Sequence, residues 1–366
     1  MPQAEYTLPP EEIDLPYRQG YARHTLVGLN LFLIKMAQQF PGVFGIPRKD
    51  PMLGSLGMAG LERTELQMVE NAMIHTAVIS VESRVINEVA GTLDVDVRID
   101  NLAGHKFPSG VSFRRAFVEF EVMNPAGQVV WHSGATDEMG VLIDAAGKPL
   151  NGELWYDNQC NKIVDQDDFQ PHYQVINRPD QVQIYQEVKL DPGDPAKTSG
   201  TPSCATDAPV DPSSNLTTSF LSICHTRKDN RLLPAGLLPF EERVAIANAL
   251  GLVNPTFEGS ETEAELLAHE SGASDVGDDP DYVTGGGDTL SYRIPLADIP
   301  GGPASIRASL HYQATPPFYL QDRFCTGEGA NRDRLFYLSS LLNTKDTPIA
   351  DWKFRMVSTG QVPITY

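Results

Sequence analysis

Three short strings of the chain hold residue types that can do chemistry. One contains His24 within a run of helical spacing, the second spans 101–110 and presents His105, and the third spans 228–236. Two glycines and a proline restrict the second string to a defined loop, which would hold its imidazole in one orientation. A neutral imidazole is a common metal ligand as well as a general base. The residue types therefore point first to ligand binding.

The motifs of the common enzyme classes do not occur in the chain. There is no G-x-S-x-G, no H-E-x-x-H, no G-x-x-x-x-G-K-[ST], and no G-x-G-x-x-G after a strand. The eight histidines are scattered singly, and no nucleophile–base arrangement is recognisable. We therefore expect a protein that is not an enzyme, with His311 on the polar face of its strand.

The cysteines carry no recognisable metal or redox signature. There are four of them and no C-x-x-C pair: Cys160, Cys204, Cys224 and Cys325. Two disulfides in any of three connectivities are compatible with this count. The dipeptide Cys224-His225 matches the end of the haem c attachment motif C-x-x-C-H, but Leu221 stands where the first cysteine would be. We expect no covalently bound haem in this chain.

Composition and charge exclude several classes of partner. The 366 residues include 28 Lys or Arg and 48 Asp or Glu, which gives a net charge of −20. We expect no binding to nucleic acid or to an anionic membrane surface, because like charges repel. The longest uncharged apolar stretch, 26–34, is shorter than the ~20 residues of a membrane helix. We expect no membrane span, and no signal peptide is recognisable in the chain as given.

The N-terminal quarter of the chain has helical periodicity. Residues 1–16 are rich in Pro and acidic residues and read as a linker, whereas 17–40 has apolar residues at helical spacing up to Pro41-Gly42. Between 61 and 88, apolar residues recur at steps of four, three and four. The spacing predicts two helices in this region.

From residue 91 onward the apolar period changes to two. Residues 93–99 alternate apolar and polar, and 118–122 and 128–132 flank the turn sequence Asn-Pro-Ala-Gly, which predicts a hairpin. Further strands are expected at 182–188, 290–296 and 306–312, and a helix at 240–250 with Gly251 after its end.

Strands that follow one another without regular helical crossovers favour an antiparallel sandwich. The fold class predicted is α+β, mainly β: an antiparallel Ig-like β-sandwich with an N-terminal helical segment and long loop insertions. We divide the chain into a linker and helical segment, 1–90, and a sandwich-like domain, 91–366. By composition, 191–218 and 258–288 are insertions.

Taken together, the three strings resemble the haem-free C-terminal region of large multihaem c-type cytochromes. Strings such as H-x-F-x-G-x-N, G-H-x-x-P-T-G-x-x-x-R-R and K-D-N-R-L-L-P recur there in this order, and here they match 24–30, 104–115 and 228–234. A further family-like stretch, 171–185, contains His172. The resemblance covers about residues 17–366, and it departs from the family at Leu26, where Phe is usual, and at Ser109, where Thr is usual.

This resemblance implies an accessory domain that caps haems, mediates contacts and can donate distal ligands in electron transfer. Haem iron in electron-transfer proteins takes two strong axial ligands, so His24, His105 and His172 are the candidate cofactor-binding residues. The implied partners are a haem-bearing cytochrome segment or subunit and other redox proteins. The implied location is periplasmic or extracellular, an oxidising context in which we expect a Cys204–Cys224 disulfide.

The first residues and the aromatic residues leave two further expectations. Met1-Pro2-Gln3 looks like the sequence that follows C-x-x-C-H in such cytochromes, which favours an N-terminally truncated chain. The alternative function is a stand-alone extracellular Ig-like module that binds carbohydrate or protein through exposed aromatics such as Trp131, Trp155 and Tyr156.

The acidic insertion 258–288 contains no Lys or Arg and is most simply a solvated loop. A sharper interpretation is a calcium site, because Ca²⁺ takes 6 to 8 oxygen ligands from flexible loops. The candidate ligands cluster around Gly and Pro turns: Asp275, Asp278, Asp279 and Asp281. Their spacing is not that of an EF-hand.

Overall fold

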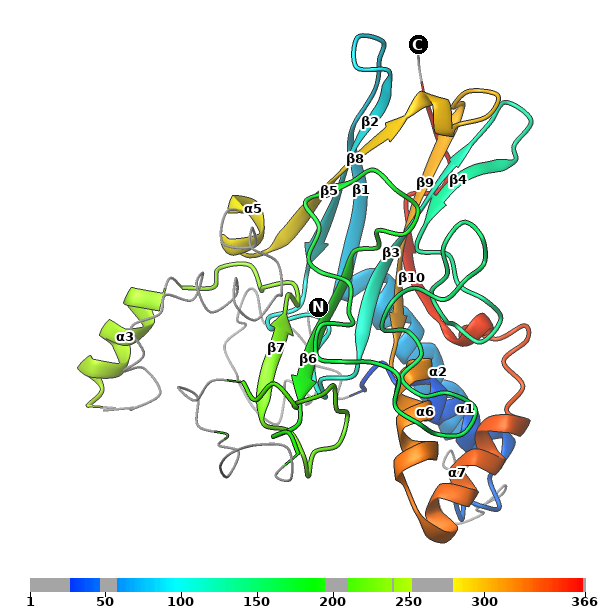
Figure 1. Cartoon of the computed structure of the whole chain (residues 1–366), viewed down its shortest axis with the longest axis vertical. Coiled ribbons are helices and arrows are strands. Elements are labelled where there is room, and N and C mark those ends of the chain that lie inside the picture. The colour runs from blue at the N-terminus through cyan, green and yellow to red at the C-terminus, as the bar shows by residue number, and fades with distance from the viewer. Residues whose placement is uncertain are drawn as a thin grey trace, which may run out of the picture.

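Two β-sheets form the body of the molecule in the computed structural model of Figure 1, and several of its helices lie together at one end. The structure describes residues 27–46, 58–194, 204, 210–238, 240–251 and 279–364. Within these residues, no helix is long and apolar enough to cross a membrane.

The described helices are α1 (Leu31–Gln39), α2 (Met58–Asn71), α3 (Phe240–Ala249), α5 (Pro280–Val283), α6 (Pro317–Thr326) and α7 (Gly329–Leu341), with short turns η1 (Ala72–Thr76), η4 (Leu296–Asp298) and η5 (Ala350–Trp352). The described strands are β1 (Ala77–Asn87), β2 (Thr92–Asn101), β3 (Arg115–Met123), β4 (Val129–Ser133), β5 (Val175–Ile176), β6 (Ile184–Leu190), β7 (His225–Asp229), β8 (Gly287–Pro295), β9 (Ser305–Gln313), β10 (Phe354–Ser358) and β11 (Val362–Pro363).

The strands form a four-stranded and a seven-stranded sheet. The smaller has the order β1-β2-β8-β5, and the larger has the order β10-β9-β3-β6-β7, with β4 added to β3 and β11 to β9. Among the described pairs, β5–β8 is parallel and the others are antiparallel. The predicted fold class, α+β and mainly β, is confirmed.

The two sheets bury their inner faces in one shared core. Apolar side chains of β2, β3, β8 and β9 belong to a single buried cluster. Across the sheets, the rings of Phe120 and Tyr292 stack with their centroids 3.9 Å apart. The alternating apolar residues that predicted β2 form the inward face of that strand. All of them are fully buried: Leu93, Val95, Val97 and Ile99.

The helix predicted over 61–88 is wrong in its second half. Helix α2 ends at Asn71, and β1 then pairs with β2 along its whole length. A bulge between Val81 and Ser83 shifts the register of this pairing. An extra residue in a strand reverses which side chains face inward. Three of the apolar residues whose spacing predicted the helix, Ile74, Val78 and Val85, are exposed, so that spacing marks no buried face.

Other expectations for single elements are confirmed. The described part of the first predicted helix is α1, capped by Asn30 Oδ1, which accepts from Leu33 N at 3.0 Å, and it ends before Phe40. The hairpin is formed by β3 and β4. Helix α3 matches the predicted 240–250, and Gly251 after it has a φ of +68°, which glycine adopts without strain.

All four cysteines are paired. The predicted Cys204–Cys224 disulfide is confirmed, and the second bridge joins Cys160 to Cys325 at the end of α6. The second bridge ties the long loop after β4 to a helix that follows β9.

Candidate functional site

The loop that carries His105 is held against the third string of the sequence. Asn101, the last residue of β2, is buried, and its side-chain amide donates to the carbonyl oxygens of His105 at 2.9 Å and Leu232 at 3.1 Å. Phe107 and Leu232 exchange two backbone hydrogen bonds, of 2.9 and 2.8 Å. Lys106 Nζ lies 2.9 Å from Asp229 Oδ2. Two strings that are more than 100 residues apart thus form one surface.

The imidazole of His105 is exposed and has one nitrogen available. Its Nδ1 lies 3.0 Å from the carbonyl oxygen of Lys106. A carbonyl oxygen only accepts, so Nδ1 carries the ring proton and Nε2 holds the lone pair. This tautomer, oriented by a backbone carbonyl, is the one that ligating histidines commonly have. His105 can therefore offer Nε2 to a metal ion outside this domain.

His172 lies inside the protein, in the segment before β5. Its Nδ1 accepts from the side-chain amides of Gln183 at 2.8 Å and Asn230 at 3.2 Å, and its Nε2 lies 3.3 Å from Asp279 Oδ2. The ring of Tyr282 packs against it, with the centroids 4.9 Å apart. Both nitrogens of His172 thus face protein groups, whereas Nε2 of His105 faces solvent. The role of His172 as a haem ligand stays a prediction.

Two more carboxylates lie close to His172. Asp288 in β8 is fully buried and accepts from the hydroxyl of Tyr185 at 2.7 Å, and burial raises its pKa. Burial also acts to raise the pKa of Asp279, but hydrogen bonds to His172 and other neighbours outweigh it and hold that pKa below its usual value. One ligand atom from each of His172, Asp279 and Asp288 lies within 4.8 Å of the others.

Sequence reasoning did not single out Asp288, although a signal was present. Leu290 and Tyr292 were recognised as the inward face of β8, and residue 288 lies on that face by the same period of two. A carboxylate at an inward position is unusual unless it is paired.

Part of the predicted calcium site falls outside the described residues, as does His24. Asp275 and Asp278 belong to this part of the chain, so the calcium site stays a prediction. Of the two described members, Asp279 faces His172, and Asp281 forms an ion pair with Arg98 at 2.7 Å. Burial and a hydrogen bond to Asp279 raise the pKa of Asp281 to about 6.

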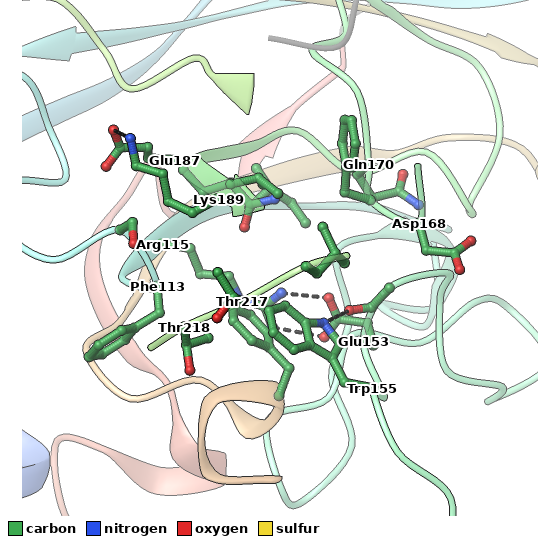
Figure 2. A pocket seen from close by; sticks show the side chains of 18 of the residues that line it. Phe113, Arg115, Glu153, Trp155, Asp168, Gln170, Glu187, Lys189, Thr217 and Thr218 are labelled. Carbon is green, nitrogen blue, oxygen red and sulfur yellow. Dashed lines mark hydrogen bonds and ion pairs between the residues drawn. The ribbon is translucent and has the colours of Figure 1, made fainter. Parts of the chain in front are cut away.

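A cleft with about 460 Å³ of empty space, including its open mouth, lies over β6 and the buried start of β3. Figure 2 shows the ion pair at its floor, where the Arg115 guanidinium forms two bonds to the carboxylate of Glu153. Gln313 also accepts from Arg115 Nε at 2.7 Å, and Glu153 accepts from the backbone N of Leu142 at 3.0 Å. The polar groups at the floor are therefore satisfied by protein partners.

The aromatic residues expected to be exposed are buried. Trp131, Trp155 and Tyr156 are 4%, 5% and 7% exposed, because the first packs between the sheets and the others pack under α6. The expectation for His311 is also wrong: it is buried, stacks on Phe117, and its Nε2 lies 2.7 Å from a Glu119 oxygen. The loops after β4 cover a sheet face that the strand pattern alone suggested was open.

Comparisons with known proteins give little. No protein-family model matches the chain, and no curated protein matches it. Among solved structures, the chain is similar to a penta-haem cytochrome c552 from Thermochromatium tepidum, with a TM-score of 0.29 and 12% sequence identity. The similarity covers 86% of this chain and 45% of that chain, so this chain spans less than half the length of the cytochrome.

Proposed function

We propose that this chain is a non-catalytic accessory domain of a multihaem c-type cytochrome. In this role it caps haems of an adjoining segment or subunit, and His105 supplies the distal axial ligand to one of them. The haem would bring the electron-transfer chemistry, and this domain would bring one imidazole and a contact surface. The proposal starts from the order of the three strings in the sequence.

The observation that carries the proposal is the state of the His105 ring. A distal ligand needs an unprotonated nitrogen that reaches out of the domain and a backbone that holds the ring still. Nε2 of His105 is exposed, its ring proton is committed to the Lys106 carbonyl oxygen, and its loop is bonded to Asn101 and Leu232. These features support ligation of an iron outside the chain.

The two disulfides support a periplasmic or extracellular location, because disulfides persist in oxidising compartments. The net charge of −20 would favour partners with basic surfaces around their haems.

The test replaces His105 in the haem-loaded cytochrome that contains this domain. We expect His105→Ala to convert one low-spin haem with two histidine ligands to a high-spin or water-ligated haem, because an axial imidazole is lost. Added imidazole should restore the low-spin spectrum. Ser109→Ala, in the same exposed loop, is the matched control and should leave the spectrum unchanged.

The same variant separates ligation from a structural role. The free energy of unfolding of the isolated chain should change by no more than about 0.5 kcal/mol, because the His105 side chain is exposed. An unchanged spin state together with a stability loss of about 1 to 3 kcal/mol would exclude His105 as the ligand.

A further inference from the structure

A buried cluster beside the four-stranded sheet has the composition of a metal site. His172 lies in the loop before β5, Asp279 directly precedes α5, and Asp288 is the second residue of β8. Helix α5 lies next to β8 (Figure 1), so three separate segments meet here. We propose that His172, Asp279 and Asp288 bind one divalent transition-metal ion of the Zn²⁺ type.

Both carboxylates of the cluster are buried. The side chains of His172 and Asp279 are 0% and 3% exposed, and Asp288 is fully buried. Among the described residues, neither aspartate forms an ion pair with a lysine or arginine; the nearby Arg98 is bonded to Asp281 and Asp100. A buried carboxylate needs a counter-charge or a proton. A divalent cation would neutralise both carboxylates at once.

An independent observation is an unpartnered oxygen in the same cluster. Asp288 Oδ2 accepts from Tyr185, but Asp288 Oδ1 is buried and has no hydrogen-bond partner among the described residues. The hydroxyl of Tyr292, two residues further along the same face of β8 than Leu290, is also buried and unpartnered. Buried polar atoms are seldom left unsatisfied, and a bound ion is one of the regular explanations.

The ligand types indicate which metal would bind. One imidazole nitrogen and two carboxylate oxygens are ligands that Zn²⁺ accepts, and they leave a fourth position for a water molecule or a neighbouring oxygen. Ca²⁺ and Mg²⁺ prefer oxygen ligands throughout. The nitrogen of His172 therefore favours Zn²⁺ over the calcium predicted for the acidic insertion. The two ligand sets share only Asp279.

Binding would move one proton of the His172 ring. Without metal, Nδ1 accepts from Gln183 and Asn230, so Nε2 carries the proton and donates to Asp279. Metal binding at Nε2 transfers that proton to Nδ1, and a carboxamide then has to turn its oxygen toward the ring. For Gln183 this gives up the bond from the backbone N of Tyr173, which is 2.8 Å long. Metal binding therefore costs this hydrogen bond, and coordination of the ion has to outweigh the loss.

The site is closed to solvent, so the ion would enter during folding. The experiment unfolds the oxidised full chain in guanidinium chloride with a chelator and refolds it with ZnCl₂, with CaCl₂ or with chelator alone. After gel filtration, the metal content is measured by mass spectrometry. We expect about one Zn²⁺ per chain, no stoichiometric Ca²⁺ at this cluster, and a higher melting temperature of the Zn²⁺ sample.

Matched variants assign the ion to the cluster. Asp279→Asn and Asp288→Asn should each weaken Zn²⁺ binding by at least about 100-fold, because each removes a charged ligand. Asp180→Asn is the control: this carboxylate is exposed and paired with Arg178 away from the cluster, so its variant should retain the ion.

Three results would overturn the proposal: refolded wild-type protein without Zn²⁺ above trace level, one Zn²⁺ per chain that survives both ligand variants, or equal loss in Asp180→Asn. The wild-type measurement needs no variant and decides the question even where a substitution prevents folding. None of these outcomes depends on haem or on His105.

Discussion

Two buried groups of charged residues lie on different sheets and differ in how their charges are met. Arg115 and Glu153, at the seven-stranded sheet, form a bidentate pair whose remaining hydrogen-bonding groups are also engaged. His172, Asp279 and Asp288, at the four-stranded sheet, bring two carboxylates together with no lysine or arginine paired to them in the described part of the chain. In the Arg115–Glu153 pair the protein itself compensates both buried charges. The two carboxylates of the other cluster need a proton or a cation to compensate theirs.

The largest expected effect comes from breaking the balanced pair. Glu153→Gln should lower the free energy of unfolding by about 3 to 5 kcal/mol, because it leaves the buried Arg115 guanidinium without its counter-charge. Urea denaturation followed by circular dichroism measures this loss. The double variant Arg115→Met with Glu153→Leu should lose much less, since it removes both charges together. A loss below about 1 kcal/mol in Glu153→Gln would contradict the comparison.

A second ion pair of the larger sheet should make stability depend on pH. Burial acts to raise the pKa of Glu119, but His311 at 2.7 Å and Lys353 at 3.6 Å outweigh it and lower that pKa from 4.5 to about 2. Burial lowers the pKa of His311, against the effect of Glu119 and in the same direction as Lys353 and Arg355.

Both shifts destabilise the fold as pH falls. A glutamate with a depressed folded pKa contributes stability above pH 4.5 that is lost as pH falls toward 2, here about 3 to 4 kcal/mol. The unfolded state also takes up a proton on His311 first, once pH falls below 6.5. Urea denaturation at pH values from 7 to 3 gives the free energy of unfolding as a function of pH. Below pH 4.5 this free energy should fall less steeply in Glu119→Gln than in the wild-type protein. Asp180→Asn, in an exposed pair, should keep the wild-type slope.

The smallest effect is expected at the unbalanced cluster. In chelator-treated protein, Asp288→Asn should change the free energy of unfolding by less than about 1 kcal/mol, because it removes a buried charge and keeps an acceptor for the Tyr185 hydroxyl. Asp288→Ala, which removes that acceptor, should cost about 1 to 3 kcal/mol. If Asp288→Asn were as destabilising as Glu153→Gln, the two clusters would not differ as described.

Much of the fold was accessible from the sequence because strand signals are local. Alternation along 93–99 and along β8 and β9 identifies inward faces that the structure confirms. The signal failed at β1, because apolar residues also stand on its exposed face, where Val78 and Val85 lie. The pairing of Cys204 with Cys224 was also within reach, because these residues are only 20 positions apart.

The candidate sites show where local reasoning ends. The Gly and Pro residues around His105 indicated a rigid, ligand-presenting loop, and the structure agrees that its ring is exposed and oriented. The same reasoning placed Trp155 and His311 on the surface, and both are buried. Whether a strand face is exposed depends on whether other segments of the chain pack against it. The alternation of apolar residues along the strand does not show this.

The sequence by itself determined the inward faces of β2, β8 and β9 and the exposed loop around His105, since both follow from residues within a few positions of one another. Only the tertiary structure decided that His172 meets Asp279 and Asp288, which follow it by more than 100 residues. That meeting depends on β8 pairing with β2 on one side and β5 on the other, which brings the segments before β5 and α5 to one place. Contacts across such distances arise from packing and burial over the whole chain, and no local pattern encodes them.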